Sequence, residues 1–132
     1  MDQRYGWTGG FPLAAQITAL VICVLGYTVF VWATASNPFF SQITRIQSER
    51  GHTVVTGGPY HTVRHPAYAG AILYELAVPV LLASWGALAI SAIGALLLIL
   101  RTALEDRTLQ AELPGYVAYA RQVRQRLVPG LW

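Results

Sequence analysis

Residues 11–35 form an apolar run without a single Asp, Glu, Lys, Arg or His side chain. A helix needs roughly 20 predominantly apolar residues to cross a hydrocarbon core about 30 Å thick. The run exceeds that length, so the sequence predicts a membrane-spanning helix over 11–35. A cleaved signal peptide is the alternative, because Ala-Thr-Ala at residues 33–35 resembles a cleavage site. The run is longer than the roughly 7–15 residues of a signal-peptide core, and Asp2 accompanies Arg4 before it, which favours the span.

A second apolar stretch covers residues 66–100 and carries one charged residue, Glu75. It is too long for a single crossing, and Ser-Trp-Gly at residues 84–86 interrupts it. Backbone groups that face lipid cannot remain unpaired. The sequence therefore predicts two antiparallel spans joined by a tight turn, over about 67–83 and 86–103.

The sequence contains no strand–helix alternation, no Gly-x-Gly-x-x-Gly motif and no Walker phosphate loop, which excludes a soluble nucleotide-binding sheet. The predicted fold class is all-α: an integral membrane helical bundle of about three transmembrane spans with a C-terminal interfacial amphipathic helix. We expect a single membrane domain over residues 1–132, because no internal repeat or low-complexity linker divides the chain.

The nine basic residues are all arginines and lie mainly on one side of the predicted spans. Three lie in the loop 36–66 and five in the tail from residue 101, whereas only Arg4 precedes the first span. With three spans, the loop and the tail share a membrane face, which the positive-inside rule makes cytoplasmic. We therefore expect an integral protein of the bacterial inner (plasma) membrane, with loop 36–66 and tail 104–132 in the cytoplasm. The net charge of +3 suits a lipid bilayer with anionic headgroups, and the arginines form no dense patch for nucleic acid.

The third span is expected to continue as a helix to about Glu112, until Pro114 and Gly115 end it. Residues 116–126 then separate into an apolar and a basic face, with Tyr116, Tyr119 and Val123 on one side and Arg121 and Arg124 on the other. This pattern is typical of an interfacial amphipathic helix. An anchor that lies beneath the bilayer is the favoured interpretation, ahead of direct contact with a ligand.

Polar and turn-forming residues concentrate in the segment 57–70, directly before the second span. The segment contains a Gly-Pro pair, two tyrosines, two histidines and Arg64. At the far end of the third span, Arg101 and Glu105 are four residues apart and so share a helix face, and Asp106 follows them. An ordinary surface ion pair explains these charges taken alone. Together with the segment 57–70 on the same membrane face, they can hold a zwitterionic amino-acid group.

No metal site is expected. His61 and His65 have the spacing of helical metal ligands, but Pro66 disfavours helical geometry at His65. The only further good ligand is His52. Glu75 lies inside a predicted span, where a carboxylate either marks a polar pathway or is neutral and hydrogen-bonded. Both interpretations of Glu75 remain open.

Four motifs follow one another along the chain. They are Gly-Pro-Tyr-His-Thr-Val-Arg-His-Pro-Ala-Tyr-Ala-Gly at 58–70, Arg-Thr-Ala-Leu-Glu-Asp-Arg-Thr-Leu at 101–109, Tyr-Val-Ala-Tyr at 116–119 and Arg-Leu-Val-Pro-Gly at 126–130. In order and spacing they resemble the isoprenylcysteine carboxyl methyltransferase and phospholipid methyltransferase superfamily, over about residues 37–132. The resemblance implies an integral membrane enzyme that binds S-adenosylmethionine at the cytoplasmic interface and receives a lipophilic substrate from the bilayer.

The resemblance also implies which residues form the site. The implied cofactor-binding residues are Tyr60, Arg64, His65, Pro66, Tyr68, Glu105 and Asp106, and the implied catalytic residues are Arg64 and Glu105. Members of the superfamily usually carry Glu-Glu where this chain has Glu105-Asp106. They also commonly have further N-terminal spans, and a homo-oligomer is one way in which this chain would close its pocket.

The predicted function is methyl transfer from S-adenosylmethionine to a lipophilic small-molecule acceptor, either a prenylcysteine-like carboxylate or a phospholipid-like amine. A sulfonium methyl donor needs in-line alignment and exclusion of water, and positioning of this kind supplies about 7–11 kcal/mol. The planar fork of Arg64 suits a carboxylate, and Glu105 suits an ammonium group or ribose hydroxyls. Two alternatives stay open. One is a membrane reductase that uses a reduced nicotinamide cofactor, because sterol reductases share a similar C-terminal helical pattern, and the other is a non-enzymatic small membrane subunit.

Overall fold

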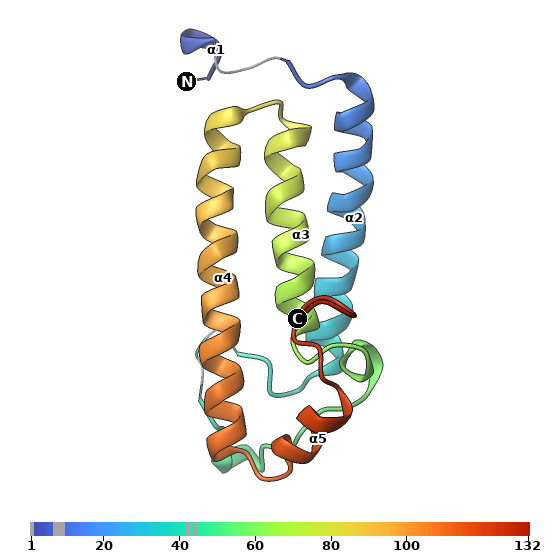
Figure 1. The fold of residues 1–132 in the computed structure, drawn as a ribbon, viewed down its shortest axis with the longest axis vertical. Helices are drawn as coiled ribbons and strands as arrows, with labels where there is room; N and C mark the ends of the chain where they lie inside the picture. The colour runs from blue at the N-terminus through green and yellow to red at the C-terminus, as the bar shows by residue number, and fades with distance from the viewer. Residues whose placement is uncertain (1, 7–9, 42, 44) are drawn as a thin grey trace.

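The computed structural model describes residues 2–6, 10–41, 43 and 45–132, and the elements it contains there are all helices. In chain order they are α1 (Asp2–Tyr5), α2 (Leu13–Ser36), η1 (Ser48–Arg50), η2 (Gly58–His61), α3 (Pro66–Leu81), α4 (Trp85–Glu112) and α5 (Tyr116–Gln122). Figure 1 shows α2, α3 and α4 side by side with α3 in the middle, while the long loop and α5 gather at one end. The predicted all-α fold is confirmed.

Two of these helices are long and apolar enough to cross a membrane. They are α2, with 24 residues, and α4, with 28 residues. In the most apolar 18-residue stretch of each helix, only 17% of α2 and 11% of α4 is buried. A core helix of a soluble protein would be mostly buried, so α2 and α4 are not helices of that kind. The third apolar helix, α3, has 16 residues and reaches about 24 Å at 1.5 Å per residue. The predicted count of three spans is therefore approximate.

The predicted turn between the second and third spans is present. Ala83 has a φ of 51°, and the side chain of Ser84 caps α4 by accepting a hydrogen bond of 3.1 Å from the Ala87 backbone N–H. A serine in this position satisfies a backbone donor that the first turn of a helix leaves free. The chain thus reverses within three residues, and α3 and α4 are antiparallel neighbours (Figure 1).

Two glycines bring α2 and α3 into close contact. A Cβ atom on Gly26 would lie 2.8 Å from the Gly70 carbonyl oxygen, and one on Gly70 would lie 2.6 Å from the Gly26 carbonyl oxygen. Small residues permit such approaches between helices in membranes, where packing replaces hydrophobic burial as the driving force. The contact places the end of α2 beside the beginning of α3, so the loop that joins them folds over one end of the bundle.

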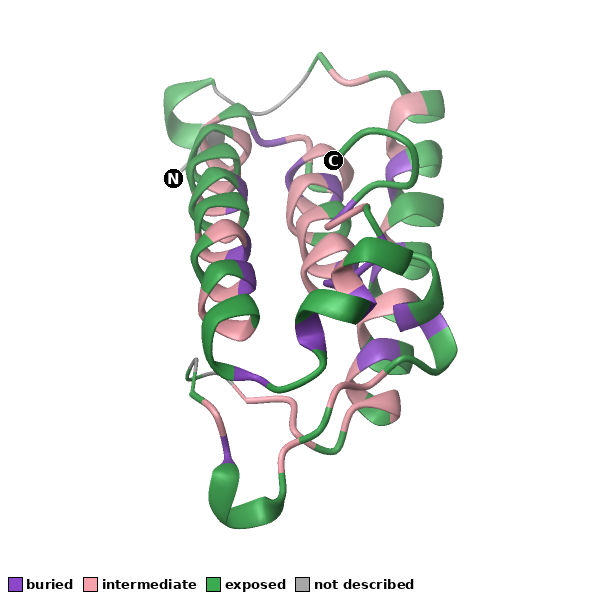
Figure 2. Cartoon of the chain, turned by 60° about the horizontal axis from the view of Figure 1, so that its bottom comes forward, coloured by how far each residue is buried: buried purple, intermediate pink, exposed green. Residues whose placement is uncertain are grey.

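Most of the bundle surface is exposed or half-buried, and Figure 2 shows buried residues concentrated where the helices meet the loop and the tail. One buried cluster consists of Leu113, Tyr116, Tyr119 and Val123. These residues include the predicted apolar face of the C-terminal helix, and they pack against Ile46, Val54, Leu109 and Ala120. The apolar face therefore contacts the protein itself, while Arg121 and Arg124 are exposed.

The C-terminal helix is shorter than the predicted range of 116–126, because α5 ends at Gln122. Beyond it the backbone pairs with the start of α3: the Arg64 N–H donates to the Gln125 carbonyl (3.0 Å) and the His65 N–H donates to the Arg126 carbonyl (2.9 Å). The Arg126 N–H, which would donate to the Gln122 carbonyl in a continued helix, donates instead to the Trp132 carbonyl at 2.7 Å. The tail is thus held against the segment in which the sequence concentrates its polar residues.

Candidate functional site

The centre of the polar end is Asp106, on the part of α4 that extends beyond its apolar section. This residue is fully buried, at 0% exposure. Arg64 binds it through one edge of its guanidinium group, with Nε donating to Oδ1 at 2.8 Å and Nη2 donating to Oδ2 at 3.0 Å. A bidentate pair of this kind is among the strongest hydrogen-bonded contacts available to a carboxylate.

Asp106 receives further hydrogen bonds from three other side chains, one on α4 itself, one on α5 and one in the tail. Gln110 Nε2 donates at 2.8 Å, Arg126 Nε at 2.9 Å and the Tyr116 hydroxyl at 3.0 Å. His65 Nε2 lies 3.4 Å from Oδ1. Burial by itself raises the pKa of Asp106, but the hydrogen bonds from His65, Arg64 and Arg126 outweigh it and hold that pKa well below its ordinary value. Asp106 is therefore an ionised anchor shared by the segment that leads into α3, by α4 and by the tail.

Four of the five N–H donors of Arg64 have partners within the protein. Its Nη1 donates to the carbonyls of Val123 and Arg124, each at 2.9 Å, in addition to the two bonds to Asp106. The Arg64 side chain is only 5% exposed. From the sequence we expect the Arg64 guanidinium group to bind a carboxylate of the ligand. In the structure it binds the carboxylate of Asp106 instead. Contact between Arg64 and a cofactor stays a prediction, and the geometry points to a positioning role.

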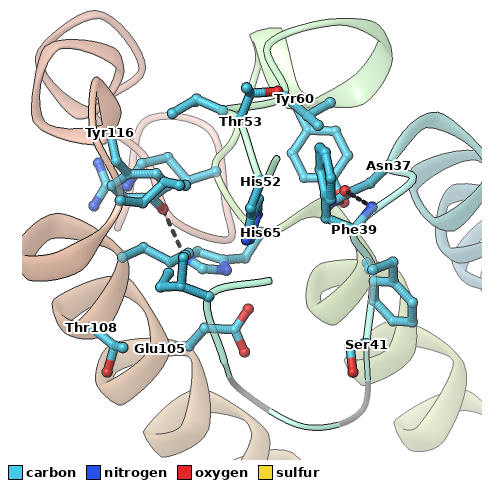
Figure 3. Close-up of a pocket in the computed structure, with 18 of the residues that line it drawn as sticks. Asn37, Phe39, Ser41, His52, Thr53, Tyr60, His65, Glu105, Thr108 and Tyr116 are labelled. Atoms are coloured by element: carbon cyan, nitrogen blue, oxygen red, sulfur yellow. Dashed lines mark hydrogen bonds between the residues drawn. The ribbon is translucent and has the colours of Figure 1, made fainter. Parts of the chain in front are cut away.

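Glu105 has a different environment from its neighbour. The Tyr68 hydroxyl donates to Glu105 Oε2 at 2.7 Å and accepts a hydrogen bond from Arg101 Nε at 2.8 Å. The predicted pair of Arg101 and Glu105 is therefore linked through a tyrosine of α3. Figure 3 shows the Glu105 carboxylate directed into a pocket, below the ring of His65.

This polar pocket lies between the loop, α3, α4 and α5, and its free volume is about 80 Å³. Five of the predicted site residues line it: Tyr60, Arg64, His65, Tyr68 and Glu105. The other two do not line it: Pro66 is buried at the first position of α3, and Asp106 is enclosed by its donors. The structure thus brings together residues that are more than 40 positions apart in the chain.

Aromatic rings form much of the remaining wall. His65 lies 6.0 Å from Tyr68 between ring centroids, and its Nε2 is 3.4 Å from the Tyr116 hydroxyl. Burial and the charge of Asp106 raise the pKa of Tyr116 well above its ordinary value, so its hydroxyl keeps its proton and donates. Tyr60 accepts a hydrogen bond from Asn37 at its hydroxyl (3.2 Å). The pocket therefore combines one carboxylate with several π faces.

Several lining residues were missed by reasoning from the sequence. They are Asn37, Phe39, His52, Thr53 and Thr108, of which four come from the loop after α2. Thr108 follows Glu105 by three positions on the same helix, which is a signal that helical spacing could have found. The loop residues carry no comparable signal, because their position depends on how the loop folds.

The three histidines have separate environments. The His61 ring contacts the Gly58 carbonyl, and His52 Nδ1 accepts a hydrogen bond of 3.3 Å from the Gln47 N–H. His65 is buried against Asp106. Among the residues that the structure describes, no group of three His, Cys, Asp or Glu side chains is arranged to hold a metal ion.

Comparison with known proteins gives a family for this arrangement. Residues 17–111 match the profile of the isoprenylcysteine carboxyl methyltransferase (ICMT) family. The chain is also similar to protein-S-isoprenylcysteine O-methyltransferase B of Arabidopsis thaliana, with 29% identity over 80 residues, or 61% of this chain. The aligned region is 38% of that relative, so the chain spans well under half of the relative's length. The family match includes α3 and the pocket residues from Asn37 to Leu109. This chain is a membrane protein that belongs to the isoprenylcysteine carboxyl methyltransferase family.

Proposed function

We propose that this protein transfers a methyl group from S-adenosylmethionine to the carboxylate of a prenylcysteine-like, lipophilic acceptor. The observation that carries the proposal is the Glu105 carboxylate, which Tyr68 orients into a pocket at the polar end of apolar helices. Family membership supports methyl transfer, and the pocket supports a cationic cofactor. The sequence also allows a phospholipid-like amine as the acceptor. Assays that offer the protein each acceptor in turn distinguish the two.

The residues of the pocket fit a sulfonium cofactor. A positive charge is attracted to the faces of aromatic rings and to a carboxylate, and the pocket offers Tyr60, Tyr116 and Phe39 beside Glu105. Glu105 would accept hydrogen bonds from the ammonium group or from ribose hydroxyls. Tyr68 holds Glu105 in place, and Arg64 holds the floor of the pocket by binding Asp106.

S-adenosylmethionine, when bound, supplies a methyl group whose bond to sulfur breaks, with its electron pair going to sulfur, as an acceptor oxygen bonds to the carbon. A carboxylate acceptor loses no proton in this reaction, so the pocket needs no general base. The contributions of the chain are alignment of the two reactants and exclusion of water, which together can supply about 7–11 kcal/mol. We assign Glu105 to cofactor contact and Arg64 to positioning.

Cofactor entry requires the polar pocket to widen. Its free volume of about 80 Å³ is below the roughly 300–1,000 Å³ of small-molecule sites. The wall across the pocket from Glu105 includes Asn37 and Phe39 of the loop (Figure 3). Their contacts include the Asn37–Tyr60 hydrogen bond, stacking of Phe39 on His52 at 4.5 Å and a 2.7 Å hydrogen bond from Gln47 Nε2 to the Phe39 carbonyl. Asn37 and Phe39 are half-buried residues of a connecting loop, whereas Asp106 is fully buried on a long helix among charged partners. Loops move more readily than the elements they connect, so we expect the loop wall to move outward while the Asp106 cluster stays in place.

The orientation of the protein is also a proposal. The polar pocket and the arginine-rich loop and tail are at the same end of the bundle, and the positive-inside rule places that end in the cytoplasm. An acceptor with a prenyl chain would then lie in the bilayer beside the apolar helices, with its carboxylate at the level of the pocket. A homo-oligomer remains one way to cover the pocket further.

Calorimetry on the protein in nanodiscs tests the proposed function. Wild type is expected to bind S-adenosylmethionine and its demethylated product, and Glu105→Gln is expected to bind both at least about tenfold more weakly, a loss of roughly 1.4 kcal/mol. Glu112→Gln is the matched control, because Glu112 is an exposed carboxylate on the same helix. Preference for a reduced nicotinamide dinucleotide would favour a reductase, and binding of neither cofactor would favour a non-enzymatic subunit.

A further inference from the structure

A second cavity lies in the apolar half of the bundle and shares no lining residue with the polar pocket. Its volume is about 480 Å³, and α2, α3 and α4 all contribute to it. The residues that matter for its chemistry are Tyr27, Phe30, Tyr74, Glu75 and Ser91. Glu75 follows Tyr68 by seven positions on α3, or about 10 Å along the helix axis. This membrane cavity is therefore separate from the proposed methyl-transfer site.

The carboxylate of Glu75 occupies a space that a glycine leaves open. A Cβ atom on Gly94 of α4 would lie 2.0 Å from Glu75 Oε1, so any larger residue there would displace the carboxylate. Within residues 2–6, 10–41, 43 and 45–132, the structure gives this carboxylate neither a hydrogen-bond partner nor an ion-pair partner. A carboxylate at membrane depth without a partner is costly. The Glu75 carboxylate would therefore be stabilised by a ligand that donates a hydrogen bond, and most strongly by a ligand that also carries a positive charge.

The aromatic residues of the cavity point to the same kind of ligand. The rings of Tyr27 and Tyr74 have centroids 6.0 Å apart at an interplanar angle of 46°, and Phe30 adds a third ring to the lining. The face of an aromatic ring attracts an ammonium group, most strongly where water is excluded. A neutral hydroxyl would satisfy the carboxylate but would not use the rings, and an anion would be repelled by Glu75.

We propose that the membrane cavity binds the ammonium group of a lipid-soluble amine, with Glu75 as its counter-ion and the rings of Tyr27 and Tyr74 beside it. The volume of about 480 Å³ is in the range of small-molecule sites. The ligand reaches the cavity from the bilayer, and its hydrocarbon chain lies against the exposed apolar side chains of α2 and α3. Binding here does not depend on methyl transfer.

Photolabelling of the full chain in nanodiscs tests this proposal. The probe is a dodecylamine that carries an alkyl diazirine, and the matched probes are the corresponding alcohol and carboxylic acid. We expect the amine to label peptides of α2 and α3 that contain Tyr27 and Tyr74, and unlabelled dodecylamine to compete. The alcohol and the acid are expected to label these peptides at least about tenfold less at equal concentration.

Two variants separate the proposed site from general partition into lipid. Glu75→Gln removes the counter-ion and also removes a charge from the membrane, so it is expected to fold and to lose at least about tenfold in labelling. Ala71→Phe fills the cavity but keeps Glu75, and it is expected to lose labelling as well. Glu112→Gln is the control that labels as wild type does. Equal labelling in Glu75→Gln and wild type, or equal labelling by amine and alcohol, would overturn the proposal.

Binding of S-adenosylmethionine, measured on the same samples, distinguishes this proposal from the proposed function. Glu75→Gln is expected to keep the wild-type affinity for S-adenosylmethionine, because Glu75 does not line the polar pocket. Loss of amine labelling with retained cofactor binding supports an independent site. Retained amine labelling in a protein that binds no cofactor would leave the membrane cavity intact and would refute only methyl transfer.

Discussion

Replacing Asp106 with asparagine is expected to release the C-terminal tail from the bundle. The substitution keeps the shape of the side chain but removes the charge that faces Arg64, whose side chain is 5% exposed. Removal of one partner from a buried, hydrogen-bonded ion pair costs about 3–5 kcal/mol, because the other charge stays buried without compensation. Arg126 adds less, since its side chain is 30% exposed and can be rehydrated. A loss of about 3–5 kcal/mol is a large share of the roughly 5–15 kcal/mol that stabilises a domain.

The effect is expected to be local before it is global, because the Asp106 cluster joins the tail to α3 and α4 whereas α2 and α3 pack through Gly26 and Gly70. Limited trypsin digestion in nanodiscs measures release of the tail through cleavage after Arg121 and Arg124, and thermal unfolding in the same preparation measures global stability. Glu112→Gln is the control. If Asp106→Asn matched wild type in both cleavage rate and unfolding temperature, the inferred role of Asp106 as the anchor of the tail would be refuted.

Three further predictions concern the ionisation of Asp106, the orientation of Glu105 and the topology of the chain. The pKa of Asp106 in the folded protein lies below its ordinary value of 3.8, so the stability that Asp106 confers is complete above about pH 5 and is lost as the pH falls towards the folded pKa. The difference in unfolding temperature between wild type and Asp106→Asn should therefore stay constant from neutral pH to about pH 5 and narrow in more acid solution. Tyr68→Phe removes the hydroxyl that links Glu105 with Arg101, and it is expected to weaken S-adenosylmethionine binding by about 1–2 kcal/mol in calorimetry while circular dichroism shows an unchanged helix content. In a Cys23→Ser background, Arg50→Cys and Arg124→Cys should react with a membrane-impermeant thiol reagent from the cytoplasmic side and Trp85→Cys from the opposite side, and labelling of the first two from different sides would contradict the topology.

The helices could be predicted from the sequence because lipid imposes simple requirements on length and polarity. An apolar run over residues 11–35 corresponds to α2, and the predicted break at residues 84–86 lies two residues beyond the observed turn at 82–84, because Trp85 and Gly86 already belong to α4. The extension of α4 to Glu112 was also predictable, since Pro114 and Gly115 follow it. These features depend only on neighbours along the chain.

The hydrogen-bond partners of Arg64 could not be predicted from the sequence, because they depend on where the C-terminal tail packs. The sequence presents Arg64 as a free fork near two carboxylates. In the folded protein, Arg64 donates hydrogen bonds to Asp106 and to the carbonyls of Val123 and Arg124. These partners are 42 to 60 positions away along the chain. The end of α5 at Gln122 has the same origin, since the Arg126 N–H donates to the Trp132 carbonyl instead of to a helical acceptor.

The distinction between Glu105 and Asp106 likewise arises from packing. Consecutive residues on a helix point in directions about 100° apart, so one carboxylate of the pair faces the polar pocket and the other faces the tail. The sequence indicated that both acids belong to the polar end. The structure shows that only Glu105 lines the pocket, and this selects it for contact with a ligand.

Methyl transfer itself is the most direct test of the proposed function. The purified protein in nanodiscs should be incubated with S-adenosylmethionine that carries an isotopically labelled methyl group and with a prenylcysteine whose carboxylate is free. The account predicts a labelled methyl ester, which base hydrolysis converts to labelled methanol, in wild type and Glu112→Gln. At an S-adenosylmethionine concentration near the wild-type dissociation constant, Glu105→Gln should form this ester several-fold more slowly. Absence of labelled ester from a wild-type protein that is folded and binds S-adenosylmethionine would contradict the proposed acceptor, and ester formation at the wild-type rate by Glu105→Gln would contradict the proposed site.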